Sequence, residues 1–234
     1  MVAELQQSPD FPPCGDVPMP PRRRRQILLS AISTVLDVGA NTGQYARWLR
    51  REVGYAGRIV SFEPVREVFE ELARNSAGDD AWECRRTALG EGSGQLELTV
   101  TRESEFSSAL EPSPHVVAHW PGAAARTTEL VPVTSLDAVW AGLGCSGSVF
   151  LKVDVEGYEL AVLRGARSVL PEVSLVELEI SIAPNFRGGP RLGEVLHALD
   201  GFGFDLVAVE QNHGDLEDGR MLMVDGVFRN RRTP

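Results

Sequence analysis

Residues 34–43, TVLDVGANTG, decide the fold of this chain of 234 residues. A short apolar run ends in a polar loop with two glycines, and Tyr45 and Trp48 follow at helical spacing. This order predicts a strand, a tight loop and a helix, which is the repeating unit of a parallel α/β sheet. Ligands of such sheets bind beyond the carboxyl ends of the strands, and the loop at 37–43 stands at that place.

The same unit recurs toward the C-terminus. Further strands are predicted at 58–63, 82–86, 95–100, 129–133, 148–154 and 173–180, with a closing antiparallel pair at 204–209 and 221–228. The run at 95–100 interrupts the alternation of strands and helices. Residues 101–125 are rich in serine, proline and histidine and are predicted to form a long loop, a candidate cover for a substrate.

Composition predicts one globular domain behind a short tail. The chain has 23 Lys and Arg against 33 Asp and Glu, a formal charge of −10, and 43% hydrophobic residues, which suffice for a core. Residues 1–26 are rich in proline and contain the basic run Arg22–Arg25. They are therefore assigned to a tail or lid, and residues 27–234 to the folded domain.

Several classes of protein fit the sequence poorly. No apolar run approaches the roughly 18 residues that span a bilayer, and no signal-peptide core is present, so a cytoplasmic protein without a membrane span is expected. Cys14, Cys84 and Cys145 lack the CxxC spacing of a zinc site and indicate no disulfide framework. The acidic balance disfavours a nucleic-acid partner, which needs a clustered basic face. A monomer and a homodimer are both compatible with antiparallel strands at a sheet edge.

The first loop suits an adenosyl amino acid better than a dinucleotide. Its glycines, Gly39 and Gly43, match neither G-x-G-x-x-G nor a P-loop, but they let a ligand lie against the backbone. Asp37 and Asn41 offer an acceptor and an amide to a zwitterionic group. Glu63 ends the second strand, where an acid accepts both ribose hydroxyls. The alternative is a structural turn beside a surface acid.

Five sequence strings together resemble the FkbM-type methyltransferases. They are VLDVGANTGQY at 35–45, FEP at 62–64, ALG at 88–90, LKVDVEGYE at 151–159 and LRG at 163–165. The resemblance extends from about Val35 to Phe228. It implies a class I methyltransferase, an α/β Rossmann-like fold with a seven-stranded, mostly parallel sheet, helices on both faces and an antiparallel last strand. It also implies S-adenosylmethionine (SAM) as the cofactor.

The resemblance places the cofactor on the loops after the first three strands. Asp37, Gly39, Asn41 and Gly43 are expected around the methionine end, Glu63 at the ribose, and Thr87 and Ala88 beside the adenine. Ser107 and Ser108 stand where similar proteins carry a serine pair before the substrate loop. Cofactor or lid contacts are one interpretation of that pair, and a turn serine is the other.

Candidate catalytic residues follow the fourth and fifth strands of the parallel core. Asp154 and Glu179 are predicted to face the acceptor, either as a site for Mg²⁺ or with Asp154 as a general base without metal. The alternative for Asp154 is a helix N-cap, and Glu156 and Glu159 would then only complement the dipole of that helix. Lys152 lies in a buried run, so it is expected to pair with a carboxylate.

Two histidines of the long loop are further candidates. A side chain that titrates near neutrality can take a proton from an acceptor hydroxyl, and His115 and His119 are such side chains. Their spacing suits one helical face, yet Pro114 and Pro121 argue against an extended helix. Ordinary loop residues are the alternative. Trp120, Tyr158 and Phe186 are candidates for an apolar wall around the acceptor, with core packing as the default.

These observations predict a SAM-dependent O-methyltransferase that acts on a hydroxyl group of a small molecule. The acceptor class, a sugar, a glycoside or a polyketide-type secondary metabolite, is implied by the family alone. Two alternatives stay open at this stage. One is an N- or carboxyl-methyltransferase with the same fold, and the other is a non-catalytic SAM-binding module.

Overall fold

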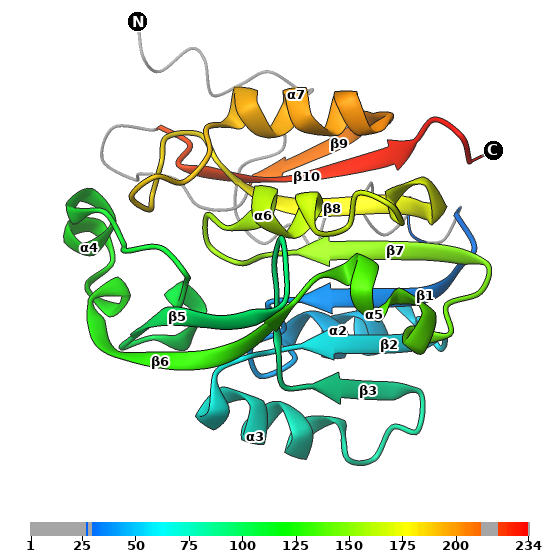
Figure 1. Cartoon of the computed structure of the whole chain (residues 1–234), viewed down its shortest axis with the longest axis horizontal. Coiled ribbons are helices and arrows are strands. Elements are labelled where there is room, and N and C mark those ends of the chain that lie inside the picture. Colours follow the sequence, from blue (N-terminus) through cyan, green and yellow to red (C-terminus); the bar gives the residue numbers. More distant parts are fainter. Residues whose placement is uncertain (1–26, 28–29, 212–219, 234) are drawn as a thin grey trace, which may run out of the picture.

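The main feature of the computed structural model, which describes residues 27, 30–211 and 220–233, is a seven-stranded sheet (Figure 1). Its order is β3-β2-β1-β7-β8-β10-β9. The strands are β1 (Ile32–Val38), β2 (Arg58–Phe62), β3 (Trp82–Arg85), β7 (Ser148–Val153), β8 (Val173–Ser181), β9 (Phe204–Gln211) and β10 (Met223–Asn230). The proposed tail 1–26, Cys14 and His213 lie outside the described residues.

Strand directions agree with the predicted topology. Strands β3, β2, β1, β7 and β8 pair in parallel, whereas β10 is antiparallel to both β8 and β9. The last strand of the chain therefore enters the sheet between two strands that precede it. The carboxyl ends of β1, β2 and β7 meet at one edge, which is where the sequence places its candidate site (Figure 1).

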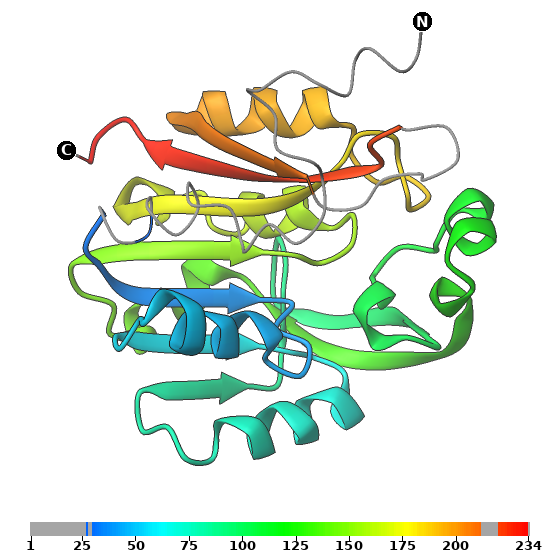
Figure 2. The same ribbon diagram turned by 180° about the vertical axis from the view of Figure 1, so that it is seen from behind.

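Helices cover both faces of this sheet because successive side chains of a strand point to opposite sides. In β1, Val35 packs on one face in a cluster with Leu49, and Leu36 packs on the other in a cluster with Leu163. Figures 1 and 2 show the two faces. The first face carries α2 (Gln44–Trp48) and the π-helix η1 (Leu49–Val53), and the second carries α5 (Leu136–Leu143), α6 (Glu159–Arg164) and α7 (Leu192–Phe202). Helix α3 (Arg66–Ser76) links β2 to β3.

A second, three-stranded sheet has the order β4-β6-β5. Its strands are β4 (Ala88–Leu89), β5 (Gly94–Thr101) and β6 (Ala125–Thr134), and β5 and β6 pair in antiparallel fashion. This sheet contains the predicted strands 95–100 and 129–133, which explains why the run at 95–100 interrupts the alternation of strands and helices. It lies beyond the carboxyl ends of the parallel strands (Figure 1).

The segment predicted as a long loop contains three short helices, so that prediction is wrong in part. They are η2 (Ser104–Phe106), α4 (Pro114–His119) and η3 (Pro121–Ala123). Helix α4 begins where the Ser113 side chain accepts the N–H of Val116, and Pro114 occupies its first turn. Phe106, Val116 and Ala123 form a small apolar cluster that holds the three helices together.

Helix α6 ends at Arg164, six residues before Leu170. The Asp137 carboxylate accepts the backbone N–H groups of Ser168 and Val169. A continuous helix would use those N–H groups within the helix, so this competition favours a turn. The 3₁₀ helix η4 (Leu170–Glu172) then leads into β8.

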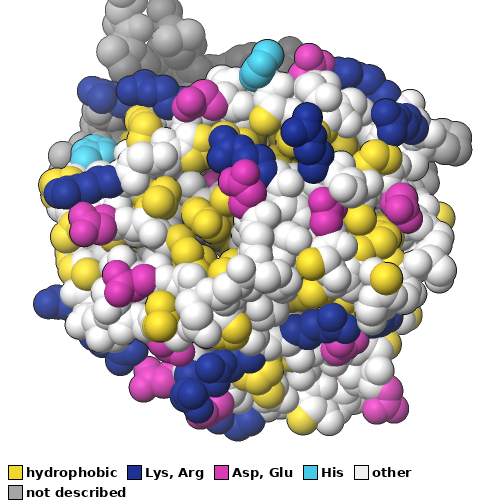
Figure 3. Space-filling model, in the orientation of Figure 1, with side chains coloured by type: hydrophobic (Ala, Val, Ile, Leu, Met, Phe, Trp, Pro, Cys, Tyr) yellow, Lys and Arg dark blue, Asp and Glu magenta, His cyan; other side chains and the backbone are white. Residues whose placement is uncertain are grey.

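The surface of the described residues carries mixed charge. Basic and acidic side chains are interspersed on the face that Figure 3 shows, without a field of one sign. Among the described residues, no helix has both the length and the apolar character needed to cross a membrane.

Candidate functional site

A cavity of about 460 Å³ lies between the carboxyl ends of β1, β2 and β7 and the second sheet. This volume is typical of small-molecule sites, which measure roughly 300–1,000 Å³. Most of the residues that the sequence selects line it: Gly39, Asn41, Glu63, Thr87, Ala88, Ser107, Ser108, Asp154 and Glu179. Asp37, Gly43, His115 and His119 are not among its lining residues.

A side chain at either glycine of the first loop would collide with other parts of the protein. A Cβ atom on Gly39 would lie 1.8 Å from the backbone oxygen of Asp154, and one on Gly43 would lie 2.6 Å from the ring of Trp82. Both glycines have left-handed backbone angles, with φ of 75° and 88°. Gly39 thus allows the loop after β1 to lie against the loop after β7, which joins two sides of the cavity.

Backbone N–H groups hold the Glu63 carboxylate at the end of β2. Oε2 accepts the N–H of Asn41 at 3.0 Å, and Oε1 accepts the N–H of Val65 at 2.9 Å. Burial raises the pKa of Glu63 to about 7, although both hydrogen bonds lower it. The carboxylate is therefore fixed in orientation at the cavity wall, with lone pairs left for a ligand.

Asn41 connects this first loop to the segment after β5. Its side-chain nitrogen donates to Ser104 Oγ at 3.1 Å, and both residues line the cavity. Sequence reasoning missed Ser104, because a serine 63 residues away gives no local signal of such a contact.

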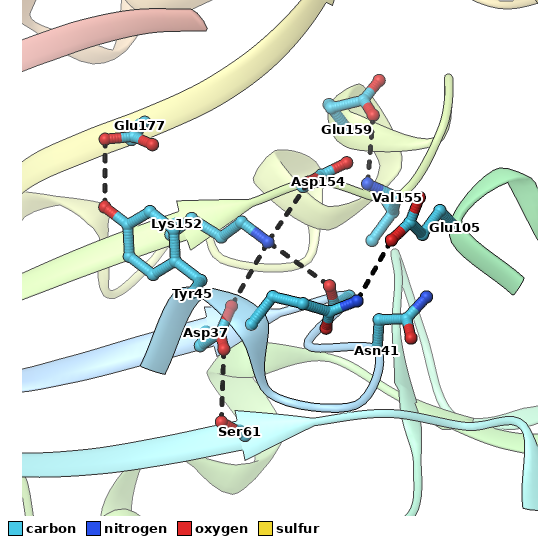
Figure 4. Close-up of polar contacts among 12 residues, drawn as sticks. Asp37, Asn41, Tyr45, Ser61, Glu105, Lys152, Asp154, Val155, Glu159 and Glu177 are labelled. Atoms are coloured by element: carbon cyan, nitrogen blue, oxygen red, sulfur yellow. Dashed lines mark hydrogen bonds and ion pairs between the residues drawn. The ribbon is translucent and has the colours of Figure 1, made fainter. Parts of the chain in front are cut away.

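Asp37 lies behind the cavity wall and contacts residues of the site without lining the cavity. It is fully buried, and its Oδ1 lies 3.3 Å from Lys152 Nζ, which also lies 3.3 Å from Asp154 Oδ2 (Figure 4). Ser61 donates to Asp37 Oδ2 at 3.3 Å. Burial raises the pKa of Asp37, and Lys152 opposes that rise. The expected pairing of Lys152 with a carboxylate is confirmed, and Asp37 anchors Lys152 instead of facing the cavity.

Lys152 contacts both carboxylates from a buried position, with only 9% of its side chain exposed. Its Nζ donates to the backbone oxygen of Gly39 at 3.3 Å and lies 5.4 Å from the ring centre of Tyr45. Burial lowers its pKa, but Asp154 and Asp37 outweigh this and hold the pKa above its ordinary value. Lys152 therefore stays charged.

Asp154 is not a helix cap. Helix α6 begins at Glu159 with Tyr158 as its N-cap residue, so the alternative interpretation of Asp154 is excluded. Glu159 serves the turn instead, because its Oε1 accepts the N–H groups of Val155 and Gly157 at 3.3 and 3.0 Å. Burial raises the pKa of Glu159 to about 7. Asp154, with 36% of its side chain exposed, is left to face the cavity.

Glu156 is a cavity residue that sequence reasoning assigned only to a helix dipole. It precedes α6, has a φ of 55°, and its backbone oxygen accepts Ser108 Oγ at 2.7 Å. Burial, Asp154 and Glu159 raise its pKa well above the ordinary range. Burial and the neighbouring Asp154 and Glu156 do the same for Glu179. The spacing Asp154-x-Glu156 before a glycine was the available signal, since a turn there brings both acids to one side.

The serine pair takes part in the fold of the cover. Ser108 Oγ accepts the N–H of Leu110, besides its bond to Glu156, and Ser107 Oγ accepts the N–H of Thr101. Both side chains therefore hold turns in the cavity wall. Ser108 in particular ties the cover to the loop after β7.

The two loop histidines share one face of α4, with ring centres 6.3 Å apart. His119 packs edge-on against Trp120, and Trp120 stacks with Phe106. Of the three aromatic residues proposed as an apolar wall, Tyr158 lines the cavity, whereas Trp120 and Phe186 do not.

Comparison with known proteins identifies the family. The profile of the methyltransferase FkbM domain matches residues 37–206, which include the first loop, Glu63 and the Asp154 segment. The chain belongs to the FkbM methyltransferase family. The resemblance read from the sequence is thus confirmed. No curated protein matches the chain in sequence.

The FkbM chain resembles solved structures at low sequence identity. An uncharacterised protein of Listeria monocytogenes serotype 4b aligns over 92% of this chain and 70% of its own, with 9% identity and a TM-score of 0.50. An FkbM methyltransferase of Methylobacillus flagellatus KT has 18% identity and a TM-score of 0.49 over 83% of this chain and 43% of its own. The FkbM chain thus spans less than half the length of that protein.

Magnesium protoporphyrin IX methyltransferase of Synechocystis PCC 6803, solved with bound SAM, has 8% identity and a TM-score of 0.49. It covers 89% of this chain and 76% of its own. The observed strand order and the family match confirm the predicted class I methyltransferase fold of the FkbM domain.

Proposed function

We propose that this FkbM domain methylates a hydroxyl oxygen of a small molecule, such as a sugar, a glycoside or a polyketide-type metabolite. One observation carries the proposal: Glu63 and Asp154 line the same cavity, one at the end of β2 and the other directly after β7. An anchor for a cofactor and a group able to accept a proton therefore share one cavity. The acceptor class rests on the family.

The residues of the first loop and of β2 suit SAM. Glu63 has fixed oxygens for ribose hydroxyls, and the Asn41 amide faces the same cavity. Thr87 and Ala88 lie beside apolar residues of the wall, which suits an adenine ring. When bound, SAM supplies a methyl group on a positively charged sulfonium.

Asp154 is the proposed acceptor of the hydroxyl proton. Lys152 Nζ lies 3.3 Å from one of its oxygens, which keeps the carboxylate in place. A carboxylate that is both fixed and open to the cavity can orient a hydroxyl and take its proton. Mg²⁺ at Asp154 and Glu179 is the alternative means of activating that oxygen.

The test is calorimetric titration of the chain with SAM and with S-adenosylhomocysteine, without added metal. We expect both to bind, and S-adenosylhomocysteine formation should then select acceptors from a panel of hydroxylated compounds. Absence of binding by either compound would overturn the cofactor assignment. A product that loses its methyl group in mild base would indicate a carboxyl acceptor, because an ether survives that treatment.

Asp154→Asn separates catalysis from binding. The variant should lose about 100-fold or more of the turnover while it still binds S-adenosylhomocysteine, which is the range for a general base. Unchanged turnover would remove Asp154 from the reaction.

A further inference from the structure

Three carboxylates converge in the part of the cavity opposite Glu63. Asp154 follows β7, Glu156 lies in the next turn, and Glu179 lies on β8. One oxygen from each lies within 4.8 Å of the others. Like charges at such distances repel strongly, so a positive charge among them would stabilise their ionised forms.

Lys152 does not serve this cluster alone. Its Nζ lies 3.3 Å from Asp154 Oδ2, but it also lies 3.3 Å from Oδ1 of the fully buried Asp37. Its positive charge is therefore divided between Asp154 and Asp37.

Among the three carboxylates, Glu156 provides the strongest evidence for a ligand site. Its residue is only 8% exposed, and it lines the cavity. Within the described part of the chain, no hydrogen bond or ion pair reaches its carboxylate, and only its backbone oxygen accepts a bond. Glu159, three residues later, shows the contrast, because two backbone N–H groups bind it. Burying an unpartnered carboxylate is costly unless a ligand binds it.

We infer that Asp154, Glu156 and Glu179 together bind one hard divalent cation of the Mg²⁺ or Mn²⁺ type. All three donors are carboxylate oxygens, the ligands that such ions prefer, and no nitrogen or sulfur ligand belongs to the cluster. Opposite oxygens around Mg²⁺ or Ca²⁺ are about 4–5 Å apart, so the observed separations are compatible with one shared ion. The sequence predicted Asp154 and Glu179 as ligands from their places at the ends of strands, and Glu156 is the ligand added here.

This site deepens the proposed function and rests on it for its role. A cation at Asp154 lies in the cavity that we assign to the acceptor, and a hard cation lowers the pKa of an oxygen that it contacts. The requirement for oxygen ligands also favours a hydroxylated acceptor over an amine. Binding of the cation itself can be measured without any acceptor.

The experiment titrates MnCl₂ into the chelator-treated full chain and follows free Mn²⁺ by its electron paramagnetic resonance signal. We expect one Mn²⁺ per chain, displaced by MgCl₂. Glu156→Gln should weaken Mn²⁺ binding by roughly tenfold or more, since it removes a charged ligand. Glu105→Gln is the matched control, because Glu105 lines the same cavity outside the cluster and should weaken Mn²⁺ binding far less than Glu156→Gln does.

Two results would overturn the inference: no Mn²⁺ binding by the parent chain, or equal Mn²⁺ binding by the parent and Glu156→Gln. Thermal unfolding and S-adenosylhomocysteine binding without metal establish that each variant is folded. They also separate the two proposals. Binding of S-adenosylhomocysteine with no binding of Mn²⁺ refutes the cation site alone, whereas absence of S-adenosylhomocysteine binding refutes the proposed function.

Discussion

The buried carboxylates at the two ends of the cavity differ in the hydrogen bonds that they receive from the backbone. At the end of β2, Glu63 receives a backbone N–H on each oxygen. Beyond β7, Glu156 receives none, and it lies close to Asp154 and Glu179. The first end is completed by the chain itself, so it is preorganised for a neutral, hydroxyl-bearing group such as ribose. The second end is where we propose that a divalent cation binds.

Lys152 is the connection between the two ends. It contacts Asp37 beneath the first loop, the backbone oxygen of Gly39 within it, and Asp154 at the second end. The comparison therefore predicts that Lys152 matters to the fold, whereas the carboxylates around it matter to ligands.

Lys152→Met should have the largest effect. It leaves Asp37 buried without its cation, which is expected to lower the free energy of unfolding by about 3–5 kcal/mol. Urea denaturation measures this loss. Asp37→Asn in the same chain should restore much of it, because it removes the uncompensated charge. Arg126→Met, which breaks an exposed ion pair with Glu67, should cost less than about 1 kcal/mol. Equal effects of the two single changes would refute the linking role.

Gly39→Ala should have the second largest effect on the free energy of unfolding. The added Cβ would meet the Asp154 backbone oxygen at 1.8 Å, so the loops after β1 and β7 would have to separate. Gly54→Ala is the matched control, since Gly54 has nearly the same φ, 74° against 75°, and no atom within 4 Å of its added Cβ. The two variants should differ by about 1–3 kcal/mol in the free energy of unfolding, the usual cost of overpacking. If both variants lost the same free energy of unfolding, the left-handed backbone angle alone would explain the loss.

Glu63→Gln tests the preorganised end. An amide accepts one of the two N–H groups but presents its own N–H₂ to the other, and it loses the charge that ribose hydroxyls would meet. S-adenosylhomocysteine should bind about 10–100-fold more weakly, as expected for a lost hydrogen bond to a charged group. Calorimetry measures this affinity, and Glu105→Gln should bind as the parent does.

The smallest expected effect is on the pH dependence of the free energy of unfolding. Glu159 has a pKa of about 7 in the fold and an ordinary value of 4.5, so between these values the folded state holds a proton that the unfolded state has released. Its contribution to stability is therefore full below about pH 4.5 and is lost as the pH rises through 7. Glu159→Gln keeps Oε1 as the acceptor for Val155 and Gly157.

The metal-free parent should lose more stability than Glu159→Gln between about pH 6 and about pH 8. The difference should be about 1 kcal/mol, measured by urea denaturation at both pH values. An identical pH dependence in the two proteins would contradict the raised pKa.

Sequence reasoning predicted the parts of the molecule that local order determines. The sheet, the loop after β1 and the place of Glu63 follow from apolar runs that end in a glycine or an acid. The pairing of Lys152 with carboxylates follows from charge within a buried run. Family resemblance added the methyltransferase activity, which no spacing alone contained.

The remaining features depend on contacts between distant segments. Asp37 and Gly43 belong to the first loop by sequence, but their surroundings are Lys152 and Trp82, so neither lines the cavity. Ser104 reaches Asn41 only because the second sheet folds over the main one. The direction of the turn after β7 decides that Glu156 faces the cavity while Glu159 binds backbone.

Anomalous diffraction from crystals grown with S-adenosylhomocysteine and MnCl₂ tests the contrast between the two ends most directly. The account predicts ribose hydroxyls on Glu63 and a single manganese peak among Asp154, Glu156 and Glu179. A ribose bound elsewhere, or a cavity with ordered S-adenosylhomocysteine and no manganese peak at the three carboxylates, would contradict it.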